Sequence, residues 1–322
     1  MSSPTIFDLA KALGLSKSTV AAALNGTGRT SEQTRERVRA MALEKGYVAN
    51  TNARRLRTRT GGMIGLYVPA DIREMDFYLG FAFGAVEAAS RHGYDLAIVT
   101  TAPEDPTGWL GYGGVIVIDV VHDDPIAHSL LQSGVPVVAA GHLDQRLSRQ
   151  VAAEIAIDHE QGIMRVLDAL ALRGVRHPAL IGASLRDEKS WSSRVLEGYL
   201  KWMEGHRLQP VARTLPPFAD NDQVLSAVHE IVAHDGIDGI VFGWQDAAER
   251  AQLILANSEE RHRDLKIGTY LSRNRARSVS RFDAALDLEP HRFGFETANT
   301  LVEIVVRGMA KNATIDFIPT LS

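Results

Sequence analysis

The stretch "SKSTVAAALNG", Ser16–Gly26, predicts a short helix that carries only small side chains along its middle. Ser16 stands where a helix N-cap is preferred, and Gly26 ends the run. Basic residues lie on both sides of these small side chains, at Lys11 and Lys17 before them and from Arg29 onward after them. A helix surrounded by positive charge favours a polyanionic partner, although this helix offers few long side chains to recognise one.

Two further helices are predicted around this one. Thr5 is placed to cap a first helix that runs to Ala12 or Leu13, and Gly14 breaks it. Ser31 is placed to cap a third helix whose apolar side chains, beginning at Val38, face inward. Helices joined by a short turn with glycine form a helix-turn-helix, an arrangement that plain helical bundles also contain. The basic charge favours DNA binding.

Charge divides the chain unevenly. Residues 1–60 hold 11 Lys and Arg against four Asp and Glu, a formal charge of +7, which leaves −11 on the remainder. A basic segment joined to an acidic body is typical of a nucleic-acid-binding module attached to another domain. Residues 47–61, "YVANTNARRLRTRTG", are predicted to be a linker in which a helix of two turns is marginal by itself.

The chain from Met63 onward alternates between apolar runs and amphipathic stretches, as in "MIGLYV" (63–68) and "GVIVIDV" (114–120). Buried strands alternating with helices predict parallel sheets covered on both faces, and about 260 residues are enough for two such α/β lobes. The chain has no cysteine, no N-terminal signal pattern and no apolar run of the roughly 20 residues that span a bilayer. We therefore expect a cytoplasmic protein without a membrane segment.

The body contains no recognisable catalytic motif. "GASLR" (182–186) lacks the closing glycine of a nucleophile elbow, and "GYGG" (111–114) precedes a strand where a dinucleotide-binding loop would follow one. The metal-capable residues at 122–124 and 158–160 are adjacent in sequence and share no helix face, so no metal site is expected. A ligand pocket is expected beyond the carboxyl ends of the strands. The residues that follow the strands are 71–78, Asp119, His142, Asp144, 184–194, 244–246 and 270–273.

The segment Thr5–Leu56 closely resembles the DNA-binding headpiece and hinge of the lactose-repressor (LacI/GalR) family. The motifs that carry the likeness are Asp8–Ala10, Gly14–Ser16, Thr19–Val20, Leu24–Gly26, Thr34–Val38 and Gly46–Asn50. The stretches at 80–99, 156–163 and 197–203 resemble the family's effector domain, which is similar to periplasmic sugar-binding proteins. The resemblance implies a three-helix headpiece, a hinge helix and a two-lobed α/β body with parallel sheets.

By that resemblance the second helix lies in the major groove of DNA, and the hinge inserts a leucine into the minor groove. The implied base-reading residues are Lys17, Ser18 and Ala22. The implied backbone-positioning residues are Thr5, Ser16, Thr19, Asn25, Ser31, Thr34, Tyr47 and Asn50, and the hinge positions are Ala53 and Leu56. Since the methyl group of Ala22 can pack on thymine but cannot bond to guanine, specificity is expected to be shared with the hinge and the dimer spacing.

The implied effector-binding positions are Phe77, Asp158, Arg194, Gln245, Asp246 and Tyr270. The chain departs from the family pattern here. Val195 stands where relatives carry a ligand-clamping arginine, Gln245 replaces an asparagine, and Tyr270 or Leu271 replaces an aspartate. The segment between Val99 and Val115 is also short, so one flanking helix is expected to be missing. The identity of the effector does not follow from the resemblance.

The expected domains are a helix-turn-helix headpiece at 1–46, a hinge at 47–61 and an effector-binding and dimerisation body at 62–322. Within the body, the first lobe is expected at about 62–152 and 289–322, and the second at about 153–288. The chain thus crosses between the lobes more than once.

The resulting prediction is a cytoplasmic homodimer that binds a pseudopalindromic operator in double-stranded DNA and responds to a small-molecule effector, a sugar or sugar derivative. A repressor is favoured over an activator, and neither catalytic activity nor a cofactor is expected. A dimer is favoured because tetrameric relatives carry an extra leucine-heptad tail, whereas this sequence stops at Ser322. The alternatives are a transporter's solute-binding protein, which needs a signal peptide and no basic headpiece, and an α/β enzyme with an accessory DNA-binding domain, which needs a catalytic constellation.

Overall fold

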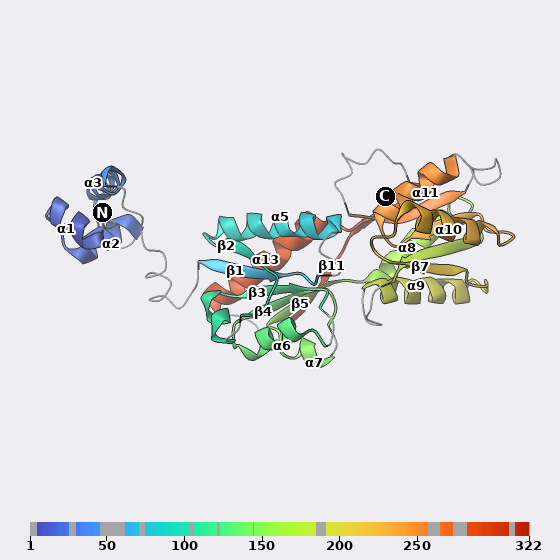
Figure 1. Ribbon diagram of the computed structural model, residues 1–322, viewed down its shortest axis with the longest axis horizontal. Coiled ribbons are helices and arrows are strands. Elements are labelled where there is room, and N and C mark those ends of the chain that lie inside the picture. Colours follow the sequence, from blue (N-terminus) through green and yellow to red (C-terminus); the bar gives the residue numbers. More distant parts are fainter. Residues whose placement is uncertain are drawn as a thin grey trace. The chain divides into compact units, whose positions relative to one another are not determined.

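The computed structural model contains two compact units, residues 1–59 and 60–322, which are described separately (Figure 1). The described residues are 5–25, 30–45, 62–70, 75–103, 106–120, 123–143, 145–184, 191–256, 265–272, 282–308 and 313–321. The predicted hinge at 47–61 lies outside them, and with it Tyr47, Asn50, Ala53 and Leu56. No helix within the described ranges is both long and apolar enough to cross a membrane.

The described part of the first unit contains three helices: α1 (Ile6–Leu13), α2 (Lys17–Asn25) and α3 (Glu32–Glu44). Each begins at the cap that the sequence predicts. The hydroxyl of Thr5 accepts a hydrogen bond from the backbone N–H of the third residue after it, at 3.4 Å. Those of Ser16 and Ser31 do the same at 3.0 and 3.3 Å. Helix α1 ends at Gly14, whose φ of 66° lies in the left-handed region that favours glycine.

A small apolar core holds these three helices together. The buried residues, two from each helix, are Leu9, Ala10, Val20, Ala23, Val38 and Ala42. The alanines of the opening stretch therefore have different roles. Ala23 faces the core, whereas Ala22 lies on the partly exposed side of α2.

The first lobe of the second unit is built on a six-stranded parallel sheet. Its strands, in spatial order, are β11 (Ala313–Phe317), β5 (Ala153–Ile157), β4 (Val137–Ala140), β3 (Val115–Ile118), β1 (Met63–Tyr67) and β2 (Asp95–Val99). The central strands are apolar on both faces, as expected for a sheet covered by helices on each side.

Long helices cover one face of this sheet, and shorter ones cover the other (Figure 1). Helices α5 (Asp76–Arg91) and α13 (Pro290–Arg307) lie on one face and receive Ile116 and Ile118. Helix α6 (Pro125–Gln132), α7 (Gln145–Ser148) and the 3-10 turn η1 (Pro106–Gly111) lie on the other. Within the described part of the segment between β2 and β3, η1 takes the place of a flanking helix, and Trp109 fills the space beneath it.

The second lobe repeats the design with a sheet of five parallel strands and one antiparallel edge strand. Its strands are β7 (Ala212–Leu215), β6 (Pro178–Ala183), β8 (Gly239–Phe242), β9 (Lys266–Leu271), β10 (Ala284–Asp287) and the antiparallel β12 (Thr320–Leu321). Its helices are α8 (His159–Ala171), α9 (Trp191–Gly205), α10 (Asn221–Val232) and α11 (Gln245–Ala256). Helices α8 and α9 pack together over one face, and α10 and α11 pack together over the other.

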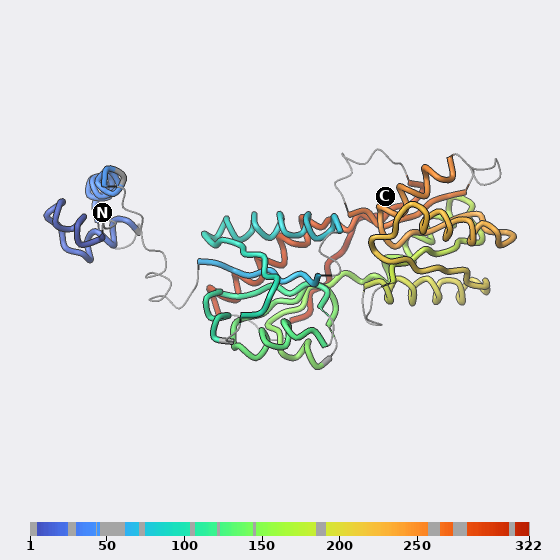
Figure 2. The backbone as a smooth tube through the Cα atoms, in the orientation of Figure 1, coloured from blue at the N-terminus to red at the C-terminus, as the bar shows by residue number. Residues whose placement is uncertain are grey.

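The chain crosses between the lobes three times, after β5, β10 and β11 (Figure 2). The predicted boundary between residues 152 and 153 is wrong by one strand. Strand β5 pairs with β4 and β11 in the first sheet, so the first crossing follows Ile157. The predicted return of 289–322 to the first lobe also needs correction, because Thr320 and Leu321 pair with β10 in the second sheet.

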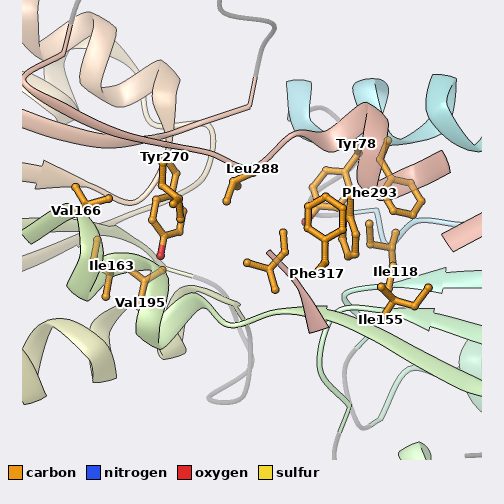
Figure 3. Close-up of a cluster of buried hydrophobic side chains, with 14 of the residues drawn as sticks. Tyr78, Ile118, Ile155, Ile163, Val166, Val195, Tyr270, Leu288, Phe293 and Phe317 are labelled. Atoms are coloured by element: carbon orange, nitrogen blue, oxygen red, sulfur yellow. The ribbon is translucent and has the colours of Figure 1, made fainter. Parts of the chain in front are cut away.

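Apolar side chains continue across these crossings (Figure 3). Phe293 and Phe317 belong to the first lobe, and their ring centroids lie 4.8 Å apart. Tyr270 and Val195 belong to the second lobe, and Leu288 lies between the two groups in the close-up. The two lobes thus share one hydrophobic cluster at the crossings.

Arg292, in the first turn of α13, joins the second crossing to the third. Its guanidinium pairs with Glu289, donates to the carbonyl of Ile318 at 2.7 Å and lies 4.1 Å from the ring centroid of Phe317. The same Glu289 carboxylate accepts from the hydroxyl of Thr320. Segments 30 residues apart in sequence are therefore held together at the point where both leave one lobe for the other.

Helices α5 and α13 cross so closely that their backbones touch. A Cβ atom at Gly84 would overlap the carbonyl oxygen of His291, and one at Gly294 would overlap the carbonyl oxygen of Phe81. Glycine is required at both positions because the obstacle in each case is backbone, which cannot rotate away.

We predict that Gly294→Ala destabilises the second unit by about 3 kcal/mol or more, since the added methyl group must force two helices apart. Gly205→Ala is the matched control: this glycine ends α9 and a Cβ there meets nothing within 4 Å. The control is expected to change stability by less than about 1 kcal/mol. Urea unfolding curves of the two variants measure the difference, and equal unfolding free energies would contradict the close crossing.

Candidate functional site

A cavity of about 300 Å³ lies in the second unit, at the carboxyl ends of the strands of both sheets. The first lobe contributes Met75, Asp76, Phe77, Tyr78 and Asp119. The second lobe contributes His159, Trp191, Pro217, Phe218, Gly243, Trp244, Asp246, Arg250, Tyr270 and Ser272, and Leu288 comes from the second crossing. A ligand held there would contact both lobes and a segment that joins them.

Aromatic side chains form much of the cavity wall. The rings of Phe77 and Tyr78, at the start of α5, meet edge to face with centroids 5.2 Å apart. In the second lobe the ring of His159 lies 6.1 Å from that of Trp191 and 5.8 Å from that of Tyr270. Such a wall suits the apolar faces of a flat ligand ring while a few polar groups fix its orientation.

Asp119 is an acidic residue of the first lobe whose position depends on an unusual backbone conformation. It follows β3 with a φ of 46°, a left-handed conformation that is uncommon outside glycine. Its Oδ2 accepts a hydrogen bond of 2.8 Å from the hydroxyl of Tyr78. A Cβ atom at Gly141 would overlap its Oδ1, so the neighbouring strand end must be glycine for the carboxylate to fit.

The surroundings of Asp119 favour its protonated form. Burial raises the pKa of this carboxyl from 3.8 to about 6, although the Tyr78 hydrogen bond and the charge of His142 act in the opposite direction. His142 itself pairs with Glu154, with 3.3 Å between Nδ1 and Oε1. Burial alone would raise the pKa of Glu154, but hydrogen bonds from His142 and Ser148 lower it overall.

His159 is an uncharged polar group in the wall. Burial lowers the pKa of its imidazole from 6.5 to about 3, and the charges of His142 and Arg194 act in the same direction. Its Nδ1 is buried and has no hydrogen-bond partner within the described part of the chain. Its backbone carbonyl accepts from the hydroxyl of Tyr270 at 2.8 Å, which ties the start of α8 to β9.

Helix α11 brings a pair of opposite charges to the other side of the cavity. Arg250 lies 2.9 Å from the carboxylate of Asp246 and donates to the carbonyl of Ala219 at 2.7 Å. Among the described residues, no group of three or more His, Cys, Asp or Glu side chains is placed to hold a metal ion. The cavity therefore presents stacking surfaces, one ion pair and the separate Asp119 carboxylate.

The first unit presents a different surface. Lys17 and Ser18 are exposed at the start of α2, and Ala22 lies on the same side one turn later. The ammonium group of Lys17 sits 4.3 Å from the ring centroid of Phe7. The buried side of α2 is turned to α1 and α3, so Lys17, Ser18 and Ala22 lie on the side of the helix that a partner could reach.

The sequence comparisons agree with this division. The family described as "Bacterial regulatory proteins, lacI family" matches residues 5–50. The transcriptional regulator RafR of Escherichia coli is 28% identical over 221 residues, which cover 65% of this chain and 64% of that protein. CelR of Thermobifida fusca is 30% identical over 206 residues, covering 61% and 60%. The chain thus matches less than two thirds of the length of these curated relatives.

Two solved structures share the fold over 99% of this chain and 98% of theirs. They are the lac repressor dimer bound to operator and the anti-inducer ONPF (TM-score 0.79, 18% identity) and the CelR–cellobiose complex (TM-score 0.68, 21% identity). Residues 5–50 thus match the lacI family, and the chain as a whole shares the fold of the lac repressor.

Three of the six predicted effector positions line the cavity: Phe77, Asp246 and Tyr270. The other three lie outside its walls. Asp158 caps α8 by accepting from Gln161. Gln245 is 1% exposed and accepts from the N–H of Ser272 at 3.0 Å, which binds α11 to the end of β9.

Arg194, the third, lies on α9 with a buried Nε that lacks a hydrogen-bond partner within the described ranges. Val195, where relatives carry a clamping arginine, is fully buried in the core beside Ile163 and Val166 (Figure 3). Among the described residues that line the cavity, none is an arginine from α9. Arg250, on α11, is the arginine of the cavity wall.

Sequence reasoning missed several wall residues. Pro217 and Phe218 follow β7, whose residues "ARTL" carry too little apolar character to be recognised as a strand. Leu288 follows β10, whose apolar run "AAL" is very short. His159 lies directly after Asp158, the residue of this stretch that the sequence predicts for effector binding. Arg250 could have been found one turn after Asp246 on the predicted helix.

We predict that the Asp119→Asn variant gains stability relative to the original protein as pH rises. A carboxyl whose pKa is raised on folding stabilises the protein at low pH, and that contribution is lost as pH rises through about 6. At about 1.4 kcal/mol per pKa unit, the difference in unfolding free energy should change by roughly 2 kcal/mol between about pH 4 and pH 8.

Denaturant unfolding over this pH range measures the effect. Asp222→Asn, which alters an exposed carboxylate on α10, is the control and should follow the original protein at every pH. Parallel curves for Asp119→Asn and the original protein would show that Asp119 is not the buried acid described here.

Proposed function

We propose that this protein is a sequence-specific DNA-binding transcriptional regulator of the lacI family, a repressor, whose affinity for its operator is controlled by a small molecule bound between the two lobes. The observation that carries the proposal is the joining of a basic helix-turn-helix unit to a two-lobed body whose cavity is lined from both lobes. A protein that regulates transcription acts in the cytoplasm of a bacterium. The relatives RafR and CelR are themselves named as transcriptional regulators.

The proposed domains follow the predicted ones with a corrected lobe boundary. Residues 1–46 serve as the headpiece, 47–61 as the hinge and 62–322 as the body. The second lobe begins after Ile157, not at residue 153, and includes the last strand. The hinge residues Ala53 and Leu56 lie outside the described part of the chain and keep the role that the family resemblance implies.

In the headpiece, Lys17, Ser18 and Ala22 are proposed to face the bases. Their exposure on one side of α2 supports this assignment. The other proposed contacts, to the DNA backbone, are Thr5, Ser16, Thr19, Asn25, Ser31, Thr34, Tyr47 and Asn50. Short hydroxyl groups at helix starts suit phosphate oxygens, because the N–H groups of a first turn point toward an anion there.

A dimer is proposed to form through an exposed apolar face on the first lobe. This face consists of Leu79, Phe83 and Val86 on α5 and Ile98 on the adjoining edge strand β2. The first three are spaced by four and three residues and so share one side of the helix. Exposed apolar groups gathered on one surface mark a protein contact. A two-fold dimer would present two headpieces to the two halves of a pseudopalindrome.

The effector is proposed to be a sugar or sugar derivative. Aromatic rings alternating with carboxylate and guanidinium groups suit a molecule with apolar ring faces and polar edges. A ligand that binds both walls of the cavity favours a closed arrangement of the lobes. Because three crossings join the lobes, closure of the lobes moves both ends of the first lobe. The coupling free energy between effector binding and operator binding is expected to be about 1–3 kcal/mol. The coupling is reciprocal, so the effector and the operator each change the affinity for the other by the same factor.

We predict that the full-length protein selects a pseudopalindrome of about 14–20 base pairs from a random duplex library, with affinity that falls steeply with salt. Ala22→Arg should move the preferred base at one position of each half-site toward guanine, by roughly 1–3 kcal/mol. Sequencing the selected DNA measures both. Absence of any preferred palindrome would contradict the proposed function.

Gln33→Arg is the matched control for this substitution. It adds the same charge at an exposed position on α3, away from α2, and should strengthen binding to all sequences alike without altering the selected motif. If Ala22→Arg behaves like Gln33→Arg, then Ala22 does not face the bases.

We predict that Phe83→Glu converts the dimer into a monomer and weakens operator binding, because two charged side chains cannot be buried opposite each other without partners. Phe83 is 61% exposed in the isolated chain. Leu253→Glu, at a 70% exposed position on α11, is the control and should remain dimeric. Sedimentation velocity measures the state of each variant, and a dimeric Phe83→Glu protein would place the interface elsewhere.

A further inference from the structure

We propose that the effector carries a protonated amino group and that the carboxylate of Asp119 binds it. The proposal rests on the proposed function, since it names the chemical class of the molecule that occupies the cavity. It narrows "sugar or sugar derivative" to amine-bearing compounds, of which amino sugars are the simplest that match the wall.

The first observation is that the fold holds Asp119 in an unfavourable backbone conformation and in an environment that is unfavourable for a carboxylate. A residue other than glycine in the left-handed region is strained, and a partly buried carboxylate loses hydration. Gly141, with a φ of 95°, leaves room for Oδ1 that any side chain would remove, and Tyr78 holds Oδ2. Two neighbouring elements, α5 and the end of β4, are thus adapted to one carboxylate on the cavity wall.

The second observation is the distribution of positive charge around it. Tyr78 is the one side chain that hydrogen-bonds to Asp119 within the described ranges. His142 acts on Asp119 through its charge, but its Nδ1 pairs with Glu154. Arg250, on the opposite side of the cavity, pairs with Asp246. A ligand cation would therefore supply the counter-charge that Asp119 lacks.

The third observation is the character of the remaining wall. The aromatic faces of Phe77, Trp191, Phe218 and Trp244 attract a cation through their π electrons and also pack on apolar ring faces. The imidazole of His159 is neutral and adds no repulsion. Asp76 is a further acidic residue of the wall. An anionic effector would meet these carboxylates unfavourably, and a neutral one would leave Asp119 uncompensated.

Proton release should accompany binding. The groups that face Asp119 are Tyr78 from α5, His142 from the end of β4 and, across the cavity, His159, Asp246 and Arg250. With a pKa near 6, Asp119 is largely protonated at about pH 5 and largely ionised at about pH 7. A bound ammonium group needs the ionised form, so affinity should increase by about tenfold over this interval.

The test is calorimetric titration of the full-length protein with two matched pairs. These are D-glucose against D-glucosamine, and cellobiose against the β-1,4-linked disaccharide of glucosamine. Each pair replaces hydroxyl by ammonium with little change of shape. At about pH 7 the better-fitting amine is expected to bind about tenfold more tightly than its neutral partner, and at about pH 5 that advantage should be lost.

Asp119→Asn is the decisive variant, since the amide keeps the shape and can still accept from Tyr78. It should bring the affinity for the amine down to that for the neutral sugar, while Asp222→Asn, at an exposed position on α10 outside the cavity, should retain the preference. Thermal unfolding and operator affinity without ligand verify that both variants are folded. If Asp119→Asn does not fold, the pH dependence of amine binding by the original protein tests the same carboxylate.

Three results would overturn the proposal: a neutral sugar that binds as tightly as its amine, an amine preference that persists in Asp119→Asn, or no binding of either amine at millimolar concentration. Operator selection separates these from a failure of the proposed function. If operator DNA is selected and cellobiose changes its affinity without any amine preference, the regulator stands and the amine class is wrong. If no operator is selected, the proposed function itself fails.

Discussion

The contact between the backbones of α5 and α13 at Gly84 and Gly294 governs the arrangement of the second unit. Helix α5 begins with the cavity residues Phe77 and Tyr78 and exposes its outer side as the proposed dimer face. Helix α13 begins directly after the second crossing. Since no side chain separates the two helices there, a movement of the crossing is transmitted to the cavity wall and the outer face together.

The Arg292 cluster extends this constraint to the third crossing. Arg292 binds Glu289 of the second crossing and the carbonyl of Ile318 of the third, so these two crossings move together. The first crossing, after Ile157, connects the lobes separately. The shared apolar cluster around Leu288 keeps water from the same region. Relative motion of the lobes is thereby limited to a narrow set of directions, which is what a ligand between them needs in order to act on the DNA-binding unit.

The sequence predicted most of the secondary structure because its signals are local. Thr5, Ser16 and Ser31 cap their helices through residues three positions away, and the buried strands can be recognised from their runs of apolar residues. The lobe boundary was misplaced because a strand such as β5 does not reveal which sheet it joins. The pairing of Asp119 with Gly141 was beyond prediction for the same reason, since it depends on the register between β3 and β4.

The placement of the tryptophans makes the chain its own optical reporter. Of four indole rings, Trp191 and Trp244 line the cavity, whereas Trp109 and Trp202 are buried in the cores of the first and second lobes. Occupation of the cavity changes the polarity around the first two and leaves the others as a constant background. Intrinsic fluorescence can therefore follow the arrival of a small molecule, whatever its identity, without any attached dye.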